Sequence, residues 1–166
     1  RYFLTLLISL VFSLHANTID TEEFDKLKIE ALLVKELTTG SVIYAKEAFK
    51  EVKPASLTKI MTAMLAIEDG HLDRPIVITS EMMGVEPTKA GYKEGEIVIL
   101  EDLVKAAMIK SDNDAAMAIA VAVGGSVPNF VAMMNQKAQT LGMNNTLFTN
   151  PCGFDIGDHP STPLDL

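Results

Sequence analysis

The chain has 166 residues, of which 48% are hydrophobic and 22% are charged. This is the composition of a globular domain and excludes a disordered chain. The net charge of −8 argues against nucleic acid as a partner, because binding to phosphates requires a basic surface.

Residues 1–16 have the pattern of a signal peptide. A positive charge at Arg1 precedes an apolar run over residues 3–14 that is too short to span a bilayer, and Ala16 is a small residue suited to cleavage. A transmembrane anchor and a buried strand are the alternatives. We therefore predict a protein that is exported to the periplasm or the cell envelope.

The remaining residues, 17–166, are predicted to form one incomplete domain. The chain begins with Arg1 and stops at Leu166 without a polar tail, so we expect a fragment at both ends. A single cysteine, Cys152, excludes an internal disulfide, and we interpret it as a small packed residue because no histidine pattern accompanies it. No set of histidine, cysteine or acidic residues has the spacing of metal ligands, so we predict no metal site.

A β-hairpin is predicted near the start of this domain. Two β-rich runs, residues 31–36 and 41–46, flank the sequence LTTG, in which Gly40 can adopt the positive φ of a tight turn. A two-stranded hairpin is marginal alone. We therefore expect it either to pair with strands from beyond Leu166 or to pack wholly on helices.

A helix is predicted to begin at Pro54, where the missing N–H is not needed, and to end with Gly70 at the C′ position. Ser56 then lies in the first turn, near the positive end of the helix dipole. The expected buried face follows the i, i+3, i+4, i+7 spacing of Leu57, Ile60, Met61 and Met64.

The next part of the chain combines short strands with a helix. Residues 75–80 predict a short strand, and residues 92–100 predict a turn followed by a second strand. Residues 100–110 predict a helix that begins with acidic side chains, which complement the helix dipole. The sequence SDN at 111–113 then interrupts the helical pattern.

Two further helices are predicted after this break. The very apolar run 114–125 predicts a helix at the centre of the core, ended by a pair of glycines. Ser126 is expected to cap the next helix, which Gly142 ends. The predicted core stripe of that helix consists of Phe130, Met133, Met134, Ala138 and Leu141.

Ser56 and Lys59 form a candidate nucleophile and base. Residues at i and i+3 lie on one helix face, so the lysine can reach the serine hydroxyl. Serine is a poor nucleophile until a base takes its proton, and lysine can act as that base when burial lowers its pKa. The pattern S-x-x-K is weak alone, because a solvated lysine beside a helix-starting serine gives the same sequence.

A second polar motif, Ser111-Asp112-Asn113, lies between two apolar helices. Asp112 or Asn113 can simply cap the following helix. In the functional interpretation, Ser111 relays a proton and Asn113 holds an amide of the substrate. S-x-x-K followed by S-D-N is the combination found in penicillin-recognising serine enzymes.

With both motifs in place, the chain resembles a family. It is similar to the D-alanyl-D-alanine carboxypeptidases, the low-molecular-mass penicillin-binding proteins of peptidase type S11, from about residue 29 to residue 166. The resemblance includes the segments 31–65, 92–120 and 130–155 as well as the motifs. It implies an α/β fold of the β-lactamase/DD-peptidase (transpeptidase-like) type, in which helical groups flank an antiparallel sheet, with its C-terminal part beyond Leu166.

The resemblance also implies acyl transfer. Ser56 would attack the bond between two D-alanines of a peptidoglycan stem peptide, Lys59 would accept its proton, and Ser111 would protonate the leaving D-alanine. The backbone N–H of Ser56 would donate to the oxyanion, Asn113 would bind substrate, and no cofactor would be needed. Implied partners are the peptidoglycan pentapeptide and β-lactam antibiotics; an inner-membrane association through a region beyond Leu166 stays open.

Three departures from the family pattern stand out. The third motif, K-T-G, is absent after residue 113, and we expect it beyond Leu166. We therefore expect this 166-residue piece alone to turn over little or no substrate. Asp112 occupies a position where relatives often have glycine, and Cys152 one where many have histidine, a position to which we assign no role.

Three alternatives remain. A D,D-endopeptidase of the same fold is not separated by the sequence. A class A-like β-lactamase is disfavoured, because that chemistry needs a glutamate after S-D-N and residues 114–166 contain none. A non-catalytic envelope protein that binds peptidoglycan is opposed by the intact set of Ser56, Lys59, Ser111 and Asn113.

Overall fold

The computed structural model describes residues 21–85, 87–154 and 159–166. The predicted signal peptide at 1–16 lies outside these residues. In chain order the elements are α1 (Glu22–Asp25), β1 (Leu32–Lys35), β2 (Val42–Lys46), the 3₁₀ turn η1 (Ala55–Leu57), α2 (Thr58–Asp69), β3 (Pro75–Val77), α3 (Ser80–Met83), β4 (Ile97–Ile99), α4 (Leu100–Lys105), the π-helical turn η2 (Ala106–Lys110), α5 (Asn113–Gly124) and α6 (Val127–Thr140).

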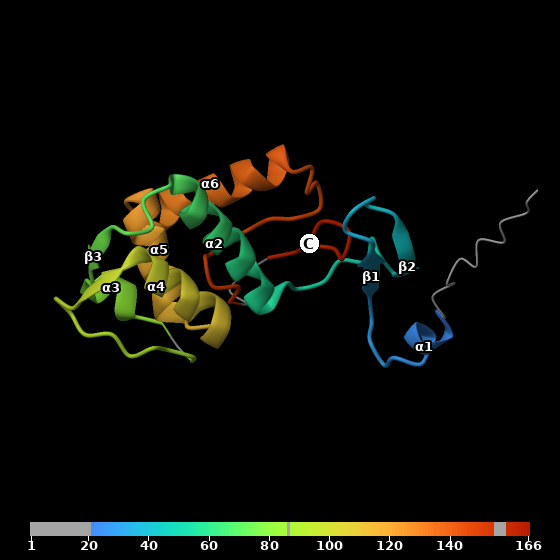
Figure 1. The fold of residues 1–166 in the computed structure, drawn as a ribbon, viewed down its shortest axis with the longest axis horizontal. Helices are drawn as coiled ribbons and strands as arrows, with labels where there is room; N and C mark the ends of the chain where they lie inside the picture. Colours follow the sequence, from blue (N-terminus) through green and yellow to red (C-terminus); the bar gives the residue numbers. More distant parts are fainter. Residues whose placement is uncertain (1–20, 86, 155–158) are drawn as a thin grey trace, which may run out of the picture.

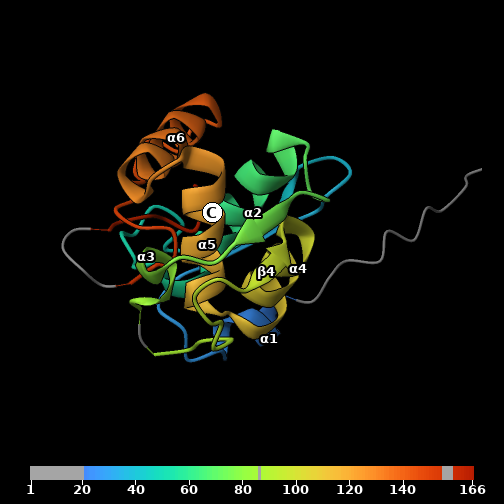
Figure 2. The ribbon, with the colours of Figure 1, turned by 90° about the vertical axis from the view of Figure 1, so that its left-hand side faces the viewer.

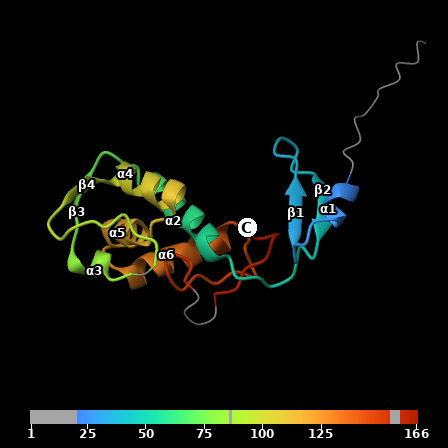
Figure 3. The same cartoon turned by 90° about the horizontal axis from the view of Figure 1, so that it is seen from below.

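The helices α2 to α6 gather at one end of the molecule, and the hairpin with α1 lies at the other (Figure 1). An extended segment joins the two parts. The C-terminal segment lies between them in Figures 1 and 3. It pairs with the connecting chain, since Val52 and Ser161 exchange backbone hydrogen bonds of 2.8 and 2.9 Å.

The predicted hairpin is confirmed. β1 pairs antiparallel with β2, with Leu32 opposite Lys46, and Gly40 in the turn has a φ of 72°. Glu36 fixes the turn by accepting the backbone N–H groups of Thr38 and Thr39 at 2.8 and 2.6 Å. Hydrogen bonds, those of Thr39 first among them, lower the pKa of this carboxyl group to about 2.

The predicted helix from Pro54 to Gly70 is present, but its predicted buried face is partly wrong. Leu57 and Ile60 are 52% and 46% exposed, whereas Met61 is buried. The stripe with this spacing that is buried lies one residue further along the chain and includes Thr58, Met61, Thr62, Leu65 and Ala66, and Lys59 and Ala63 beside it are buried as well. The spacing of apolar residues does not predict this stripe, because two of its members, Thr58 and Thr62, are polar.

Both threonines have buried hydrogen-bond partners. Thr62 donates from Oγ1 to the carbonyl of Pro151 at 2.7 Å. The Oγ1 atom of Thr58 lies 3.0 Å from Nε2 of His159, and Nδ1 of that ring accepts the backbone N–H of Thr149 at 3.2 Å. Nε2 of a neutral ring is then the donor to Thr58. These bonds make a polar helix face compatible with burial.

The two strands predicted from 75–80 and 92–100 are confirmed as an antiparallel pair, β3 and β4. They are shorter than expected. Ser80, placed at the end of a strand by the sequence pattern, instead begins α3, which packs against α5 and buries Met82 in the core. The helix predicted over 100–110 forms as α4 and continues as the π-helical turn η2.

Helix α5 is the centre of the core, as predicted. Figure 2 shows it running between α2, α3, α4 and α6. Its buried face is rich in alanine, which allows neighbouring helices to approach closely. Gly125 ends the helix with a φ of 73°. A Cβ atom on Gly124 would lie 2.7 Å from Cβ of Phe130, so the turn into α6 depends on that glycine.

Helix α6 begins as predicted, with Ser126 Oγ accepting the N–H of Asn129 at 3.3 Å. Phe130, Met134 and Ala138 are buried. Leu141 is 50% exposed, contrary to prediction, because the helix ends at Thr140. Within the described residues no single helix meets the length and hydropathy of a membrane span; α5 and α6, bent by 85°, meet that test only as a pair.

Candidate active site

The N-terminus of α2 presents Ser56 to solvent. Ala55, directly before it, has a φ of 47°, in the left-handed region that non-glycine residues seldom occupy. Ser56 therefore follows a sharp turn and lies in η1, the 3₁₀ turn that leads directly into the regular α-helix at Thr58. Backbone strain of this kind gathers at functional sites, where the surrounding packing holds it in place.

Lys59 lies beside Ser56 and is only 2% exposed. Its Nζ is 3.4 Å from Oγ of Ser56, a long hydrogen bond, and donates to the carbonyl of Cys152 at 2.9 Å. Burial lowers the pKa of Lys59, and the negative charge of Asp112 opposes part of that shift. A buried lysine with a lowered pKa is suited to accept a proton.

Ser111 reaches the same point from another element. The π-helical turn η2 leads into it, and Ser111 itself has a φ of 60°, again in the left-handed region. Its Oγ donates to Oγ of Ser56 at 2.9 Å. The structure therefore brings Ser56, Lys59 and Ser111 together, with the Ser56 oxygen between an amine and a second hydroxyl.

Asn113 lies deeper than these three residues. It is the first residue of α5, is 5% exposed, and its backbone N–H donates to the carbonyl of Thr88 at 2.8 Å. In the described part of the chain, a hollow opens at Ser56 between α2 and η2, and Asn113 does not line it. Its predicted contact with substrate stays a prediction.

Asp114, to which the sequence reasoning gave no role, anchors a neighbouring loop. This buried carboxylate accepts the backbone N–H groups of Ala90 and Gly91 at 3.0 and 2.9 Å. With the bond from Asn113 to Thr88, it ties residues 88–91 to the start of α5. An acidic residue directly after S-D-N at a helix start is the signal that sequence reasoning had available.

A hollow of about 390 Å³ opens at Ser56, between α2 and η2. Its lining is mostly apolar, with side chains of Leu57, Ile60 and Met108 around the polar atoms of Ser56, Lys59 and Ser111. Apolar walls with a few convergent polar groups are typical of a small-molecule site.

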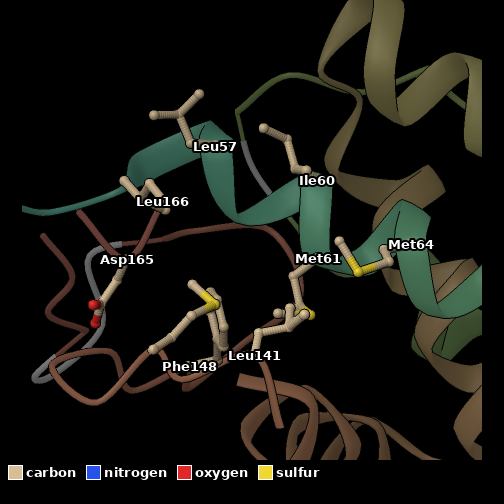
Figure 4. A pocket seen from close by; sticks show the side chains of 9 residues that line it. Leu57, Ile60, Met61, Met64, Leu141, Phe148, Asp165 and Leu166 are labelled. Atoms are coloured by element: carbon tan, nitrogen blue, oxygen red, sulfur yellow. The ribbon is translucent and has the colours of Figure 1, made fainter. Parts of the chain in front are cut away.

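A second hollow, of about 230 Å³, lies along α2 and shares Leu57 and Ile60 with the first. Figure 4 shows Met61 pointing from α2 toward Leu141 and Phe148, which form the facing wall. The exposed apolar face of α2 therefore separates two hollows. This accounts for the exposure of side chains that the sequence pattern assigned to the core.

Cys152 is buried, as predicted, but it also takes part in the site. Burial raises the pKa of its thiol to about 12, so the side chain is not a nucleophile. Its carbonyl oxygen, not its side chain, contacts Lys59. A backbone contact leaves no signal in residue type, which is why sequence reasoning missed it. In the described part of the chain, no three histidine, cysteine or acidic side chains gather as a metal site requires.

Comparison with known proteins extends these observations. The sequence profile of the D-alanyl-D-alanine carboxypeptidase family, peptidase S11, matches residues 17–166. The chain is 36% identical to the D-alanyl-D-alanine carboxypeptidase DacF of Bacillus subtilis over 138 residues, covering 79% of this chain and 35% of DacF. It is 37% identical to a D-alanyl-D-alanine endopeptidase of Pseudomonas aeruginosa over 139 residues, covering 81% of this chain and 44% of that protein.

Solved structures of D-alanyl-D-alanine carboxypeptidases and penicillin-binding proteins are also similar to this chain. The D-alanyl-D-alanine carboxypeptidase DacD of Francisella tularensis superposes with a TM-score of 0.80 at 36% identity, covering 84% of this chain and 35% of that one. Penicillin-binding protein D2 of Listeria monocytogenes, in its ampicillin-bound form, superposes with a TM-score of 0.71 at 28% identity, covering 82% and 57%. The predicted fold class is thus confirmed, and the chain spans less than half the length of the two curated relatives described above.

Proposed function

Since the chain belongs to the D-alanyl-D-alanine carboxypeptidase family of peptidases, S11, we propose that its protein removes the terminal D-alanine from peptidoglycan stem peptides. The observation that carries this proposal is the position of the Ser56 hydroxyl, 3.4 Å from Nζ of Lys59 and 2.9 Å from Oγ of Ser111. A nucleophile in contact with a buried base and a second proton carrier is the arrangement that acyl transfer needs.

In the first step, Oγ of Ser56 bonds to the carbonyl carbon of the penultimate D-alanine. Neutral Lys59 takes the hydroxyl proton as the bond forms. The lowered pKa of Lys59, caused chiefly by burial, supports this role because it increases the neutral fraction. The backbone N–H of Ser56 is proposed as one donor to the oxyanion.

In the second step, the peptide C–N bond breaks and the terminal D-alanine leaves. Its amine receives the proton that Lys59 had taken, passed through the Ser111 hydroxyl. The contact of 2.9 Å between the two serine oxygens supports this relay. Water then attacks the ester carbonyl, which releases the shortened peptide and restores the Ser56 hydroxyl. Every proton in the cycle is carried by these side chains and water, so the mechanism uses no metal or cofactor.

β-Lactams are proposed to acylate the same serine. Opening of the lactam ring breaks an amide C–N bond as the peptide reaction does, and the hollow at Ser56 has the mostly apolar lining that a small ligand favours. The structural similarity to an ampicillin-bound penicillin-binding protein supports this partner. We further propose export to the periplasm or cell envelope, where peptidoglycan and β-lactams meet the enzyme.

A D,D-endopeptidase is the second candidate. It is favoured by one specific observation, which is that a relative described as an endopeptidase is as similar to this chain as the carboxypeptidase DacF. Both reactions use the same acyl transfer at a D-alanyl bond. They differ in whether the leaving amine is free D-alanine or belongs to a cross-linked peptide.

Substrate assays separate these functions. The protein, at the full length that its gene encodes, would be incubated with diacetyl-Lys-D-Ala-D-Ala and, separately, with cross-linked muropeptide dimers. The carboxypeptidase proposal predicts release of D-alanine from the tripeptide that is lost in Ser56→Ala. Cleavage of dimers without release of D-alanine would contradict the carboxypeptidase proposal and support the endopeptidase. Cleavage of neither substrate would contradict both enzymes and support a protein that only binds peptidoglycan.

A further inference from the structure

The loop that contacts Lys59 is organised by one side chain, that of Asn150. Its amide oxygen accepts three successive backbone N–H groups, those of Cys152 at 3.1 Å, Gly153 at 2.8 Å and Phe154 at 3.0 Å. Its amide nitrogen donates to the carbonyl of Phe154 at 3.0 Å. The side chain therefore closes the turn from both sides and fixes the peptide planes within it.

This turn directs two successive carbonyl groups at α2. The carbonyl of Pro151 accepts the hydroxyl of Thr62 at 2.7 Å, and the carbonyl of Cys152 accepts Nζ of Lys59 at 2.9 Å. All four of these residues are buried. Because these groups are buried, water has little access to take the place of either carbonyl as a hydrogen-bond partner. The orientation of the Lys59 amine therefore depends on the turn.

The same turn also contacts the second motif. The thiol of Cys152 donates to the carbonyl of Asn113 at 3.4 Å. One loop thus touches the helix of the first motif and the start of the helix that follows the second. A change in its conformation would displace both sides of the site together.

The turn is pressed against the backbone that carries the nucleophile. A Cβ atom on Gly153 would lie 1.7 Å from the carbonyl oxygen of Ala55, the residue before Ser56. The approach is therefore as close as a glycine permits. Because the two backbones pack this closely, a change in the conformation of the loop would displace η1.

We propose that Asn150 is a positioning residue for acylation, which holds the Cys152 carbonyl where it orients the Lys59 amine toward Ser56. The inference rests on the proposed function. A neutral amine that donates one N–H to this carbonyl can turn its lone pair toward the hydroxyl of Ser56. Without the turn, the long lysine side chain and its amine rotate among several orientations, and proton transfer loses its alignment.

The test compares Asn150→Ala and Asn150→Asp with the control Asn144→Ala, an exposed asparagine in the same segment. Rates of acylation by a fluorescent penicillin would be measured against pH in the full-length protein, with melting temperatures to correct for the folded fraction. We expect Asn150→Ala to acylate about tenfold to a hundredfold more slowly after that correction, as a misplaced catalytic group does.

The aspartate variant tests positioning separately from stability, through the acylation rate at high pH and the pH dependence of acylation. It keeps the acceptor for the three N–H groups but loses the donor to the Phe154 carbonyl, so the acylation rate at high pH should lie between the rates of Asn150→Ala and the wild type. Its added negative charge near Lys59 favours the ammonium form, so the rising limb of the pH profile should move to higher pH.

Two results would overturn the inference alone. One is an Asn150→Ala variant that acylates at the wild-type rate per folded molecule. The other is an Asn150→Asp variant that matches Asn150→Ala in rate and leaves the pH profile unmoved. A wild-type protein that takes no label at all would overturn the proposed function, and this inference with it.

Discussion

The hydroxyl oxygens of Ser56 and Ser111 lie 2.9 Å apart, although 55 positions separate the two residues in the chain. Each is delivered by a segment with a positive φ, at Ala55 before the first serine and at Ser111 itself. The two motifs thus meet at two helix boundaries, where the positive-φ turns direct both serine hydroxyls to the same point. The contact places the Ser111 hydroxyl beside that of Ser56, the nucleophile that we propose.

If Ser111 relays the proton, removing its hydroxyl should impair release of D-alanine. Ser111→Ala and Ser111→Gly are both expected to lower that release by about a hundredfold or more, the loss typical of a missing proton carrier. The glycine variant should be more stable than the alanine variant by about 1 kcal/mol, because Ser111 has a left-handed backbone. A glycine variant with wild-type release would show that Ser111 only shapes the turn.

The charge of Asp112 should set part of the pH dependence. Burial lowers the pKa of Lys59, and Asp112 opposes that shift. In Asp112→Asn the opposing charge is gone, so the pKa of Lys59 falls further and the rising limb of the acylation profile should move to lower pH. Glu81→Gln, an exposed carboxylate on α3, is the control and should leave the limb in place. A shift of the Asp112→Asn limb to higher pH would contradict this assignment.

Gly153 should be intolerant of a side chain. Gly142 is the matched control, since both glycines have positive φ values, 82° and 77°, but a Cβ on Gly142 meets nothing within 4 Å. Gly142→Ala should cost about 1–2 kcal/mol through backbone strain alone. Gly153→Ala should cost about 1–3 kcal/mol more from overpacking against Ala55, and should slow acylation. Equal losses in chemical denaturation would argue against the close approach.

The buried hydrogen bond of Thr62 should contribute to the free energy of unfolding. Thr62→Val leaves the buried carbonyl of Pro151 without its donor, which should cost about 1–3 kcal/mol. Thr140→Val removes a comparable bond, 3.0 Å to the carbonyl of Gln136, on the exposed end of α6 and should change stability by less than about 0.5 kcal/mol. Denaturant unfolding of both variants checks the difference, and an inverted order would refute the buried bond.

Local patterns predicted much of this fold. Glycine at the turn predicted the hairpin, and the long apolar run predicted α5 as the core helix. The i, i+3 spacing of Ser56 and Lys59 predicted that they lie side by side. These features depend on residue type and periodicity, which a sequence displays directly.

The remaining features depend on contacts between distant segments. The buried stripe of α2 includes Thr58 and Thr62, whose partners lie about ninety to a hundred residues further along the chain. The carbonyl of Cys152 binds Lys59 through the backbone, and Asn150 acts through the turn that it closes. No residue pattern near α2 encodes these contacts, so they became visible only in three dimensions.

The most direct test of the central claim is covalent labelling by a fluorescent penicillin. The full-length protein would be compared with Ser56→Ala and with Ser80→Ala, an exposed serine at the start of α3, each checked for folding by its melting temperature. Acyl transfer at Ser56 predicts label on the wild type and on Ser80→Ala, and none on folded Ser56→Ala. An unlabelled wild type, or label that persists in Ser56→Ala, would contradict it.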